Sequence, residues 1–399
     1  MFFGLTAIEC FVVIIAIYTV LFWIIPKKHV WFVFSVVVIL LAVLAFNMEP
    51  NPTDDLTRYY EHLDYLRERG YDGLLYLIET NNNNWQTYRV CAYYFYFISL
   101  FPDNHYMSAV TIFIVYGLMF LVFYKASRKF GVAKWCLYLG TMFFLATYWY
   151  YDTASGVRNG LAFAVIIACA YYHLVEKKNI FLCILGYAAA CFTHSAGIML
   201  VALIILALLT CNVKGNAINV LLVFGLAGGS ALIQFLATIT DNSFIQSVAG
   251  KAEVNAAAES LDSGTMFYVN LATYVFVAAV IAYVSWYINR SELYGDIKKF
   301  YKFSLIIMFF MLGTLYSGLV FVRFARWIIP VIGSLLFMTG MQFQSESIRK
   351  MPASYAYDGP FGETLRLKTR SIFVLAFFGY TSVHLWYLCT GSSLNWMHF

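Results

Sequence analysis

Charged side chains are scarce in this chain of 399 residues, of which only 12% are Asp, Glu, Lys or Arg. An ordinary soluble domain carries about 25% charged residues. Hydrophobic residues make up 62% of the sequence, and even a large soluble domain buries only about 75% of the surface that its unfolded chain exposes. Water therefore cannot be the solvent for most of this surface, and we predict an all-α polytopic membrane protein.

Motifs for metals, cofactors and nucleotides are also missing. The cysteines in the apolar runs stand at no metal-ligand spacing, and there is no Gly-rich phosphate loop, HExxH or GxSxG motif. The net charge of +5 would favour nucleic acid in a soluble protein, but here the basic residues lie in short gaps between apolar segments. We expect no nucleic-acid partner, no metal site and no cofactor, and we leave dependence on divalent cations open.

Long apolar runs, by contrast, are abundant. A membrane-spanning helix needs roughly 17 to 25 apolar residues, and on this criterion we expect about 12 spans, within a range of 11 to 14. The candidate segments are 3–25, 30–47, 105–125, 135–151, 157–175, 180–193, 196–210, 217–239, 266–289, 303–321, 324–343 and 371–389.

The connections between these runs predict how the chain is oriented. Most lysines and arginines fall in alternate connections, which we place in the cytoplasm by the positive-inside rule. Both ends of the chain and the long loops 48–104 and 240–265 then face outward, and 344–370 is a cytoplasmic loop. The aromatic-rich run 86–101 is predicted to be an interfacial or re-entrant helix. No linker or soluble appendage interrupts the sequence, so we expect residues 1–399 to form one integral membrane domain.

The first outward loop predicts an amphipathic helix lying on the membrane surface. Thr53 or Asp54 can cap its start, and apolar side chains then recur at helical spacing. Asp55, Arg58 and His62 stand at i, i+3 and i+7, so a carboxylate, a guanidinium and an imidazole share one face. The alternative is a solvated helix with an ordinary ion pair.

Three arginines lie at or near membrane depth. Arg158 is expected in the first turn of the helix that begins near residue 157, where it opposes the helix dipole and favours an anion unless Asp152 pairs with it. Arg323 and Arg326, at i and i+3 in an apolar run, are expected to face a protein interior or a watery cavity. The alternative for that pair is that both side chains reach the lipid headgroups.

A single histidine interrupts another apolar stretch. His194 is predicted to lie in a tight outward turn between two short helices. It could act as a proton shuttle, bind a diphosphate or cap the turn. The arginine sites, His194 and the acid-rich helix are thus expected on the same membrane face.

These motifs resemble a known family. The segments 156–164 (GVRNGLAFA) and 189–196 (AACFTHSA), with a Lys-containing turn between them, are similar to the EpsG branch of the Wzy-type polysaccharide polymerases. Segment 53–60 (TDDLTRYY) resembles the signature of that family's first outward loop. Asn159 stands where glutamine is more usual.

The resemblance implies a glycosyltransferase that joins oligosaccharide repeat units carried on undecaprenyl diphosphate. Its place would be the periplasmic face of the bacterial inner membrane, and its fold would be similar to the GT-C architecture of enzymes that use polyprenol-linked donors. The implied partners are the lipid-linked donor and acceptor, membrane lipid and a chain-length regulator.

The chemistry of such a transfer indicates roles for the residues above. Cations aimed at the departing diphosphate lower the barrier, and the candidates are Arg158, Arg323, Arg326, Arg58 and His194. A base must accept the proton of the attacking hydroxyl, and the candidates, in order, are Asp55, Asp54 and His62. The rings of Tyr59 and Tyr60 could stack on sugars.

Two other classes stay open on the sequence alone. A transporter or flippase of lipid-linked oligosaccharide would also place arginines in a cavity, although it would more often show paired halves. A ligase that moves finished glycan to another acceptor would need similar chemistry.

Overall fold

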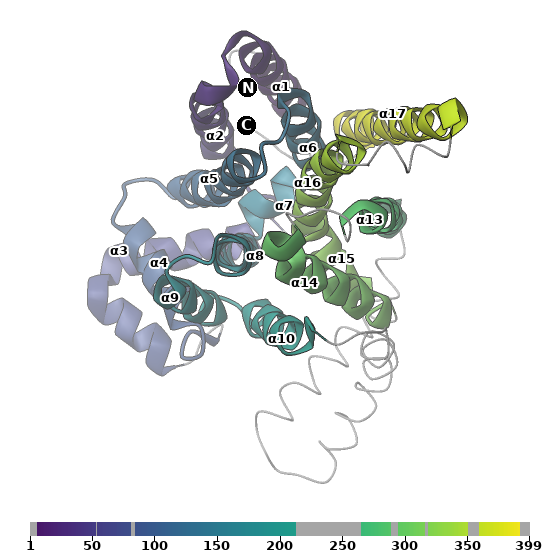
Figure 1. Cartoon of the computed structure of the whole chain (residues 1–399). Coiled ribbons are helices and arrows are strands. Elements are labelled where there is room, and N and C mark those ends of the chain that lie inside the picture. Colours follow the sequence, from purple (N-terminus) through teal and green to yellow (C-terminus); the bar gives the residue numbers. More distant parts are fainter. Residues whose placement is uncertain are drawn as a thin grey trace.

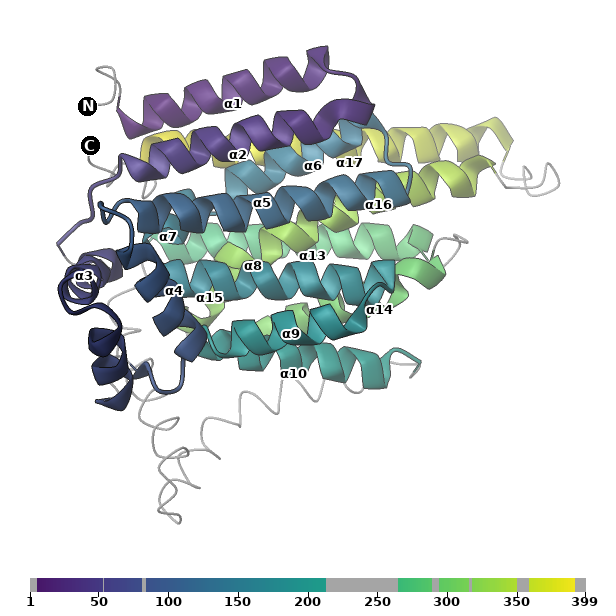
Figure 2. The ribbon, with the colours of Figure 1, turned by 90° about the vertical axis from the view of Figure 1, so that its left-hand side faces the viewer.

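The computed structural model describes residues 6–52, 54–80, 84–212, 265–288, 294–315, 318–349 and 359–391. Every regular element in these ranges is a helix, as predicted. Figure 2 shows the long helices side by side along a common direction. They are α1 (Ala7–Ile24), α2 (Val30–Phe46), α5 (Tyr106–Lys129), α6 (Lys134–Thr147), α8 (Val157–Tyr171), α9 (Ile180–Cys191), α10 (Ser195–Thr210), α13 (Thr265–Ile288), α14 (Tyr294–Gly313), α16 (Ile329–Arg349) and α17 (Gly359–Gly391).

The length and hydropathy of these helices match a membrane protein. In the described ranges, seven helices are long and apolar enough to cross a membrane, and α9 and α10 are shorter apolar helices. The chain is therefore a polytopic membrane protein. The predicted run 217–239 lies outside the described residues, so the total of about 12 spans and the GT-C-like architecture remain predictions.

Four further helices gather near one end of this bundle: the 25-residue α3 (Asp55–Glu79) and the short helices α4 (Arg89–Ser99), α7 (Tyr150–Ser155) and α15 (Gly318–Trp327). The 11 residues of α4 are too few to cross a bilayer, in agreement with the interfacial helix predicted for 86–101. Helix α3 is amphipathic and bends at Gly70, whose φ of 60° lies in a region that glycine adopts readily.

One predicted boundary is wrong. The run 303–321 was expected to be one span, but α14 begins at Tyr294, ends at Gly313 and is followed by the separate helix α15. The connection predicted at 344–370 lies between the candidate spans Val320–Gln344 and Arg370–Thr390, although α16 continues to Arg349 and α17 begins at Gly359. An apolar run marks the lipid-facing length, whereas helical hydrogen bonds continue through the polar turns on either side. The predicted loop 240–265 lies outside the described residues except for Thr265.

The lysine-rich connections lie at the opposite end of the bundle from α3 and α4 (Figure 2). There Lys177 donates to Asp296 at 2.9 Å, and Lys129 lies 3.5 Å from the same carboxylate. Helix α1 begins and α17 ends at the α3 end. This arrangement agrees with the predicted topology, while the assignment of the two ends to cytoplasm and periplasm remains a prediction.

Helix α6, which precedes α7, packs closely against α16, which follows α15. Ser334 of α16 donates its hydroxyl to the carbonyl of Gly140 on α6 at 2.7 Å. A Cβ atom at Gly140 would lie 2.5 Å from a side-chain carbon of Met338. Only glycine permits this approach, which holds α6, and with it α7, against α16.

Candidate active site

Arg158 joins the transmembrane bundle to the surface helix α3. It stands in the first turn of α8, as predicted. Its Nε donates to the hydroxyl of Tyr59 at 3.0 Å, and its guanidinium lies 5.5 Å from the centre of the same ring. Tyr59 is only 4% exposed and packs edge-on against Phe95 at 5.0 Å, so this buried phenol contributes to both the position and the direction of the cation.

Arg326 is held by α7. Its guanidinium donates to the Asp152 carboxylate at 2.5 Å and lies 4.7 Å from the centre of the Trp149 ring. The Arg326 and Asp152 side chains are 12% and 18% exposed. Within the described ranges, Arg326 Nε is a buried donor that no hydrogen bond satisfies. A buried donor without an acceptor is costly, so this nitrogen is disposed to bind an anion.

Arg323 lies one turn before Arg326 on α15. It is partly buried, and none of the ion pairs formed by the described residues involves it. Arg326 and Arg158 are close enough to act electrostatically on its guanidinium, as is Tyr59. Three like charges from α8 and α15 therefore lie together at the α3 end of the bundle. Their role in binding diphosphate remains a prediction.

Asp54 faces the bundle rather than capping its own helix. It occupies the position before α3, but its side chain makes no capping bond. Its carboxylate accepts the hydroxyl of Tyr151 on α7, and Tyr151 in turn accepts an amide hydrogen from Asn51 at 2.6 Å. Tyr151 is next in sequence to Asp152, the partner of Arg326, so the carboxylate of Asp54 is connected to the helix that holds Arg326.

Asp55, the first-ranked base, has a different environment. It forms with Arg58 the ordinary ion pair that was given as the alternative, and the two side chains are 43% and 64% exposed. Exposed pairs of this kind contribute little to stability. Asp54, which is bonded to Tyr151 of α7, is therefore better placed on the side of the bundle than Asp55.

His62 lies on the face of α3 that packs against the protein. Its ring is half-buried and lies edge-on to Trp85, with 5.6 Å between ring centres. Burial lowers the pKa of His62 below its ordinary value of 6.5, and the positive charges of Arg158 and Arg58 lower it further, while Glu61 opposes the change. His62 is therefore neutral at pH 7 and able to accept a proton.

His194 caps α10, one of the alternatives predicted for it. Its Nδ1 accepts the backbone N–H of Ala196 at 3.1 Å. The ring lies nearly parallel to that of Tyr88, with 6.1 Å between centres, and Tyr88 is close enough to influence Arg158. The turn that holds His194 thus borders the arginine cluster.

Tyr59 and Tyr60, which were predicted to stack on sugars, pack against protein side chains. Tyr59 is buried beneath Arg158, so its ring faces protein on both sides. Tyr60 is partly buried, and its ring lies edge-on to His105 at 5.6 Å. Since both rings already pack against protein side chains, sugar stacking does not fit this arrangement.

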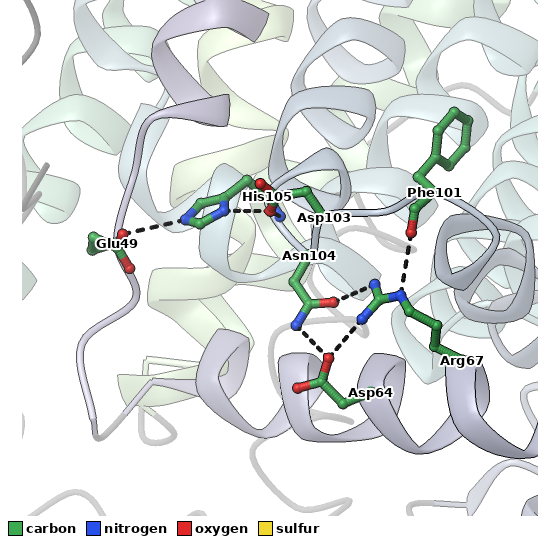
Figure 3. Close-up of polar contacts among 7 residues, drawn as sticks. All are labelled: Glu49, Asp64, Arg67, Phe101, Asp103, Asn104 and His105. Carbon is green, nitrogen blue, oxygen red and sulfur yellow. Dashed lines mark hydrogen bonds and ion pairs between the residues drawn. The ribbon is translucent and has the colours of Figure 1, made fainter.

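A polar network anchors α3 over the bundle (Figure 3). Arg67 donates to Asp64 and to Asn104, each at 2.7 Å, and to the Phe101 carbonyl at 3.3 Å. Asn104 also donates to Asp64 at 2.9 Å. Next to it, His105 lies between Asp103 and Glu49, at 2.5 Å and 3.5 Å. The network joins α3 to the start of α5 and so stabilises the face that carries Tyr59 and His62.

Sequence reasoning missed several residues of this site. Trp149 and Tyr151 lie at the end of an apolar run. Aromatic residues there usually mark the membrane interface, so they gave no sign of a site. A signal was present, since Asp152 follows them directly and a carboxylate there needs a cation. In the part of the chain that the structure describes, no three His, Cys, Asp or Glu residues gather as a metal site would require.

Comparison with known proteins gives one match, to a family. The model of the EpsG family matches residues 30–355, a range that includes α3, Arg158, His194 and both arginines of α15. No curated protein and no solved structure matches the chain.

Proposed function

Because the chain belongs to the EpsG family, the family of Wzy-type polysaccharide polymerases, we propose that it elongates a surface polysaccharide by glycosyl transfer. The donor is a glycan chain linked to undecaprenyl diphosphate, and the acceptor is a single lipid-linked repeat unit. The reaction takes place at the α3 end of the bundle, which we place at the periplasmic face of a bacterial inner membrane.

The observation that carries this proposal is the cluster of Arg158, Arg323 and Arg326. Burying like charges together is expensive unless an opposite charge joins them, and Asp152 is bonded to Arg326. A diphosphate supplies several negative oxygens, and the planar guanidinium group binds phosphate oxygens through two parallel hydrogen bonds.

The transfer needs the cations where charge develops. The acceptor hydroxyl attacks the anomeric carbon of the donor sugar, and the bond from that carbon to the phosphate oxygen breaks. The electron pair leaves with the polyprenyl diphosphate, whose new negative charge the three guanidinium groups stabilise. The proton of the acceptor hydroxyl passes to a base on the protein.

Asp54 is the base that we favour. Its carboxylate is oriented by Tyr151, which is covalently next to the residue that positions Arg326. His62 is the alternative, since it lies on the same face of α3 as Tyr59, close to Arg158, and is neutral at pH 7. Asp55 is the least suited of the three, because it forms an exposed pair with Arg58.

Purified protein incubated with its lipid-linked repeat unit should produce a ladder of lengthening glycans. Arg323→Ala should abolish the ladder and leave single repeat units, because the departing diphosphate loses a cation that the fold holds at membrane depth. Arg128→Ala is the matched control, an exposed arginine in the last turn of α5 at the other end of the bundle, and it should retain the full ladder.

The same assay distinguishes a polymerase from a transporter and from a ligase. Unchanged ladders from both variants would contradict the proposed site. A transporter would move the lipid-linked unit across a liposome membrane without changing its length, and a ligase would transfer glycan to a different acceptor without producing a ladder.

A further inference from the structure

His105 lies where four segments meet at the α3 end of the bundle. It stands directly before α5, and its ring centre is 5.9 Å from that of Phe46 at the end of α2 and 5.6 Å from that of Tyr60 on α3. Figure 3 shows Glu49, from the connection between α2 and α3, on one side of the ring and Asp103 on the other. Each ring nitrogen of this largely buried imidazole, which is 23% exposed, therefore faces a carboxylate.

The contact with Asp103 determines which nitrogen carries the hydrogen of the neutral ring. Nδ1 lies 2.5 Å from the Asp103 carboxylate, which also accepts the backbone N–H of His105 at 2.9 Å. Burial raises the pKa of the Asp103 carboxyl, but these hydrogen bonds and the nearby positive charge of Arg67 outweigh it and leave that pKa below its ordinary value. Asp103 is therefore ionised and can only accept, so Nδ1 is the donor.

Nε2 then presents a lone pair to Glu49 whenever the ring is neutral. The distance from Nε2 to the Glu49 carboxylate is 3.5 Å. Two acceptors that face each other repel, whereas a second proton on the ring makes Nε2 a charged donor to Glu49. Among the described residues, neither Glu49 nor Asp103 has another ion-pair partner. A favourable contact with Glu49 thus requires the doubly protonated ring.

The other titratable and charged groups around the ring do not supply this proton. Burial raises the pKa of the Tyr60 hydroxyl well above its ordinary value of 10, so the phenol stays neutral. Arg67 already donates to Asp64 and to Asn104, each at 2.7 Å. In the described part of the chain, His105 thus faces two carboxylates, one neutral phenol and, beyond Asp103, an arginine that has a carboxylate partner.

Glu49 begins the stiff connection that leads to Asp54. Pro50 and Pro52 restrict the backbone on both sides of Asn51. The side-chain amide of Asn51 donates to α7 at 2.6 Å, and its carbonyl accepts the backbone N–H of Asp54 at 3.0 Å. How firmly Glu49 is held therefore affects the positions of Asn51 and Asp54.

We propose that Glu49, Asp103 and His105 form an acid-closed latch. When His105 is doubly protonated, it bonds to both carboxylates and holds the connection of Asn51 and Asp54 against the start of α5. When the ring loses a proton, the bond to Glu49 is lost and the connection loosens. Histidine ordinarily changes its charge between about pH 5 and pH 8, so the latch responds to acidity at the α3 end of the bundle. Only the consequence for Asp54 as a base rests on the function proposed above.

Hydrogen exchange of the Asp54 amide tests the latch in the full-length protein without any substrate. The protein is held in phosphatidylcholine nanodiscs, with EDTA present so that no metal ion can join the two side chains, at about pH 5 and about pH 8. The exchange rate is corrected for its intrinsic dependence on pH. Protection of the wild-type protein should fall roughly two- to fivefold from the lower to the higher pH, as the loss of a partly exposed ion pair implies.

Glu49→Gln is the most informative variant. An amide can donate to the neutral ring and accept from the protonated one, so protection should stay at the level of the acidic sample at both pH values. Glu49→Ala should show the lower protection at both. Glu68→Gln is the matched control, because Glu68 is an exposed glutamate of α3 that forms none of the ion pairs of the described residues, and it should keep the wild-type response. His62 titrates in all four proteins, so the comparison isolates His105.

Equal protection of the wild-type protein at both pH values would overturn the latch, as would a wild-type response in Glu49→Gln or a lost response in Glu68→Gln. The result is separable from that of the polymerisation assay. If the protein forms no ladder but shows the expected pattern of exchange, the latch is established and the proposed function fails. If ladders form and exchange does not respond to pH, the function stands and the latch is wrong.

Discussion

Replacing Tyr59 with phenylalanine removes one oxygen atom from the site and keeps the ring. The lost hydroxyl accepts the 3.0 Å hydrogen bond from Arg158 Nε, while the ring beneath the guanidinium remains. A buried hydrogen bond to a charged group contributes about 1.5 to 3 kcal/mol. Each 1.36 kcal/mol of lost transition-state stabilisation lowers a rate about tenfold. If Tyr59 directs Arg158 at the diphosphate, Tyr59→Phe should slow polymerisation by roughly 10- to 100-fold.

Tyr94→Phe provides the control. Tyr94 is also a tyrosine at this end of the bundle, but its hydroxyl bonds to Thr111 at 2.8 Å rather than to an arginine. Tyr59→Phe loses the bond with Arg158, and Tyr94→Phe loses the bonds with Thr111 and with the Met107 carbonyl at 3.4 Å, so the thermal unfolding midpoint should fall in both variants. The initial rate of ladder formation at saturating donor should fall only in Tyr59→Phe. Equal rates for the two variants, at equal folded fractions, would refute the positioning role of Tyr59.

Further tests concern the base and the anchoring of α3. Asp54→Asn should abolish polymerisation and retain ligand binding, whereas Asp55→Asn should keep most of the rate; the reverse result would restore the first-ranked base. Because the pKa of His62 in the folded protein lies below its ordinary value of 6.5, the unfolded chain binds the proton first; the free energy of unfolding should therefore fall as the pH falls from 6.5 to the folded pKa and level off below it, and His62→Gln should remove this dependence. Arg67→Ala removes three hydrogen bonds and should lower the free energy of unfolding by about 1 to 3 kcal/mol, measured in denaturant.

The arginines could be found in the sequence because charge in an apolar run is costly and therefore rare. Their partners could not be found in the same way. Asp152 was weighed as a partner for Arg158, six positions away, but the structure pairs it with Arg326, 174 positions away. Tyr59 and Arg158 are 99 positions apart. Helical periodicity relates residues within a few turns, whereas these contacts depend on how α3, α7, α8 and α15 pack.

In helix α3, too, some features could be predicted from the sequence and others could not. Its start, its amphipathic character and the local pair of Asp55 and Arg58 follow from spacing along one helix. Spacing does not predict which carboxylate faces the bundle, because Asp54 and Asp55 are adjacent and chemically equivalent. The choice is made by Tyr151, on a helix nearly a hundred residues later, and by the network of Arg67 and Asn104 that holds α3 in place.

The energetic cost of the arginine cluster is itself an argument for a ligand. An apolar side chain at Arg323 would pack into the bundle without desolvating a charge, and replacing buried ions by apolar groups is often neutral or stabilising. The chain instead keeps Arg323 near Arg326 and Arg158 and orients the last two with Asp152 and Tyr59. Such positioning adds little to folding, but it allows the cations to stabilise a developing negative charge without reorganising during the reaction. Removing Arg323 should therefore leave the fold as stable as before or more stable, and lose the chemistry.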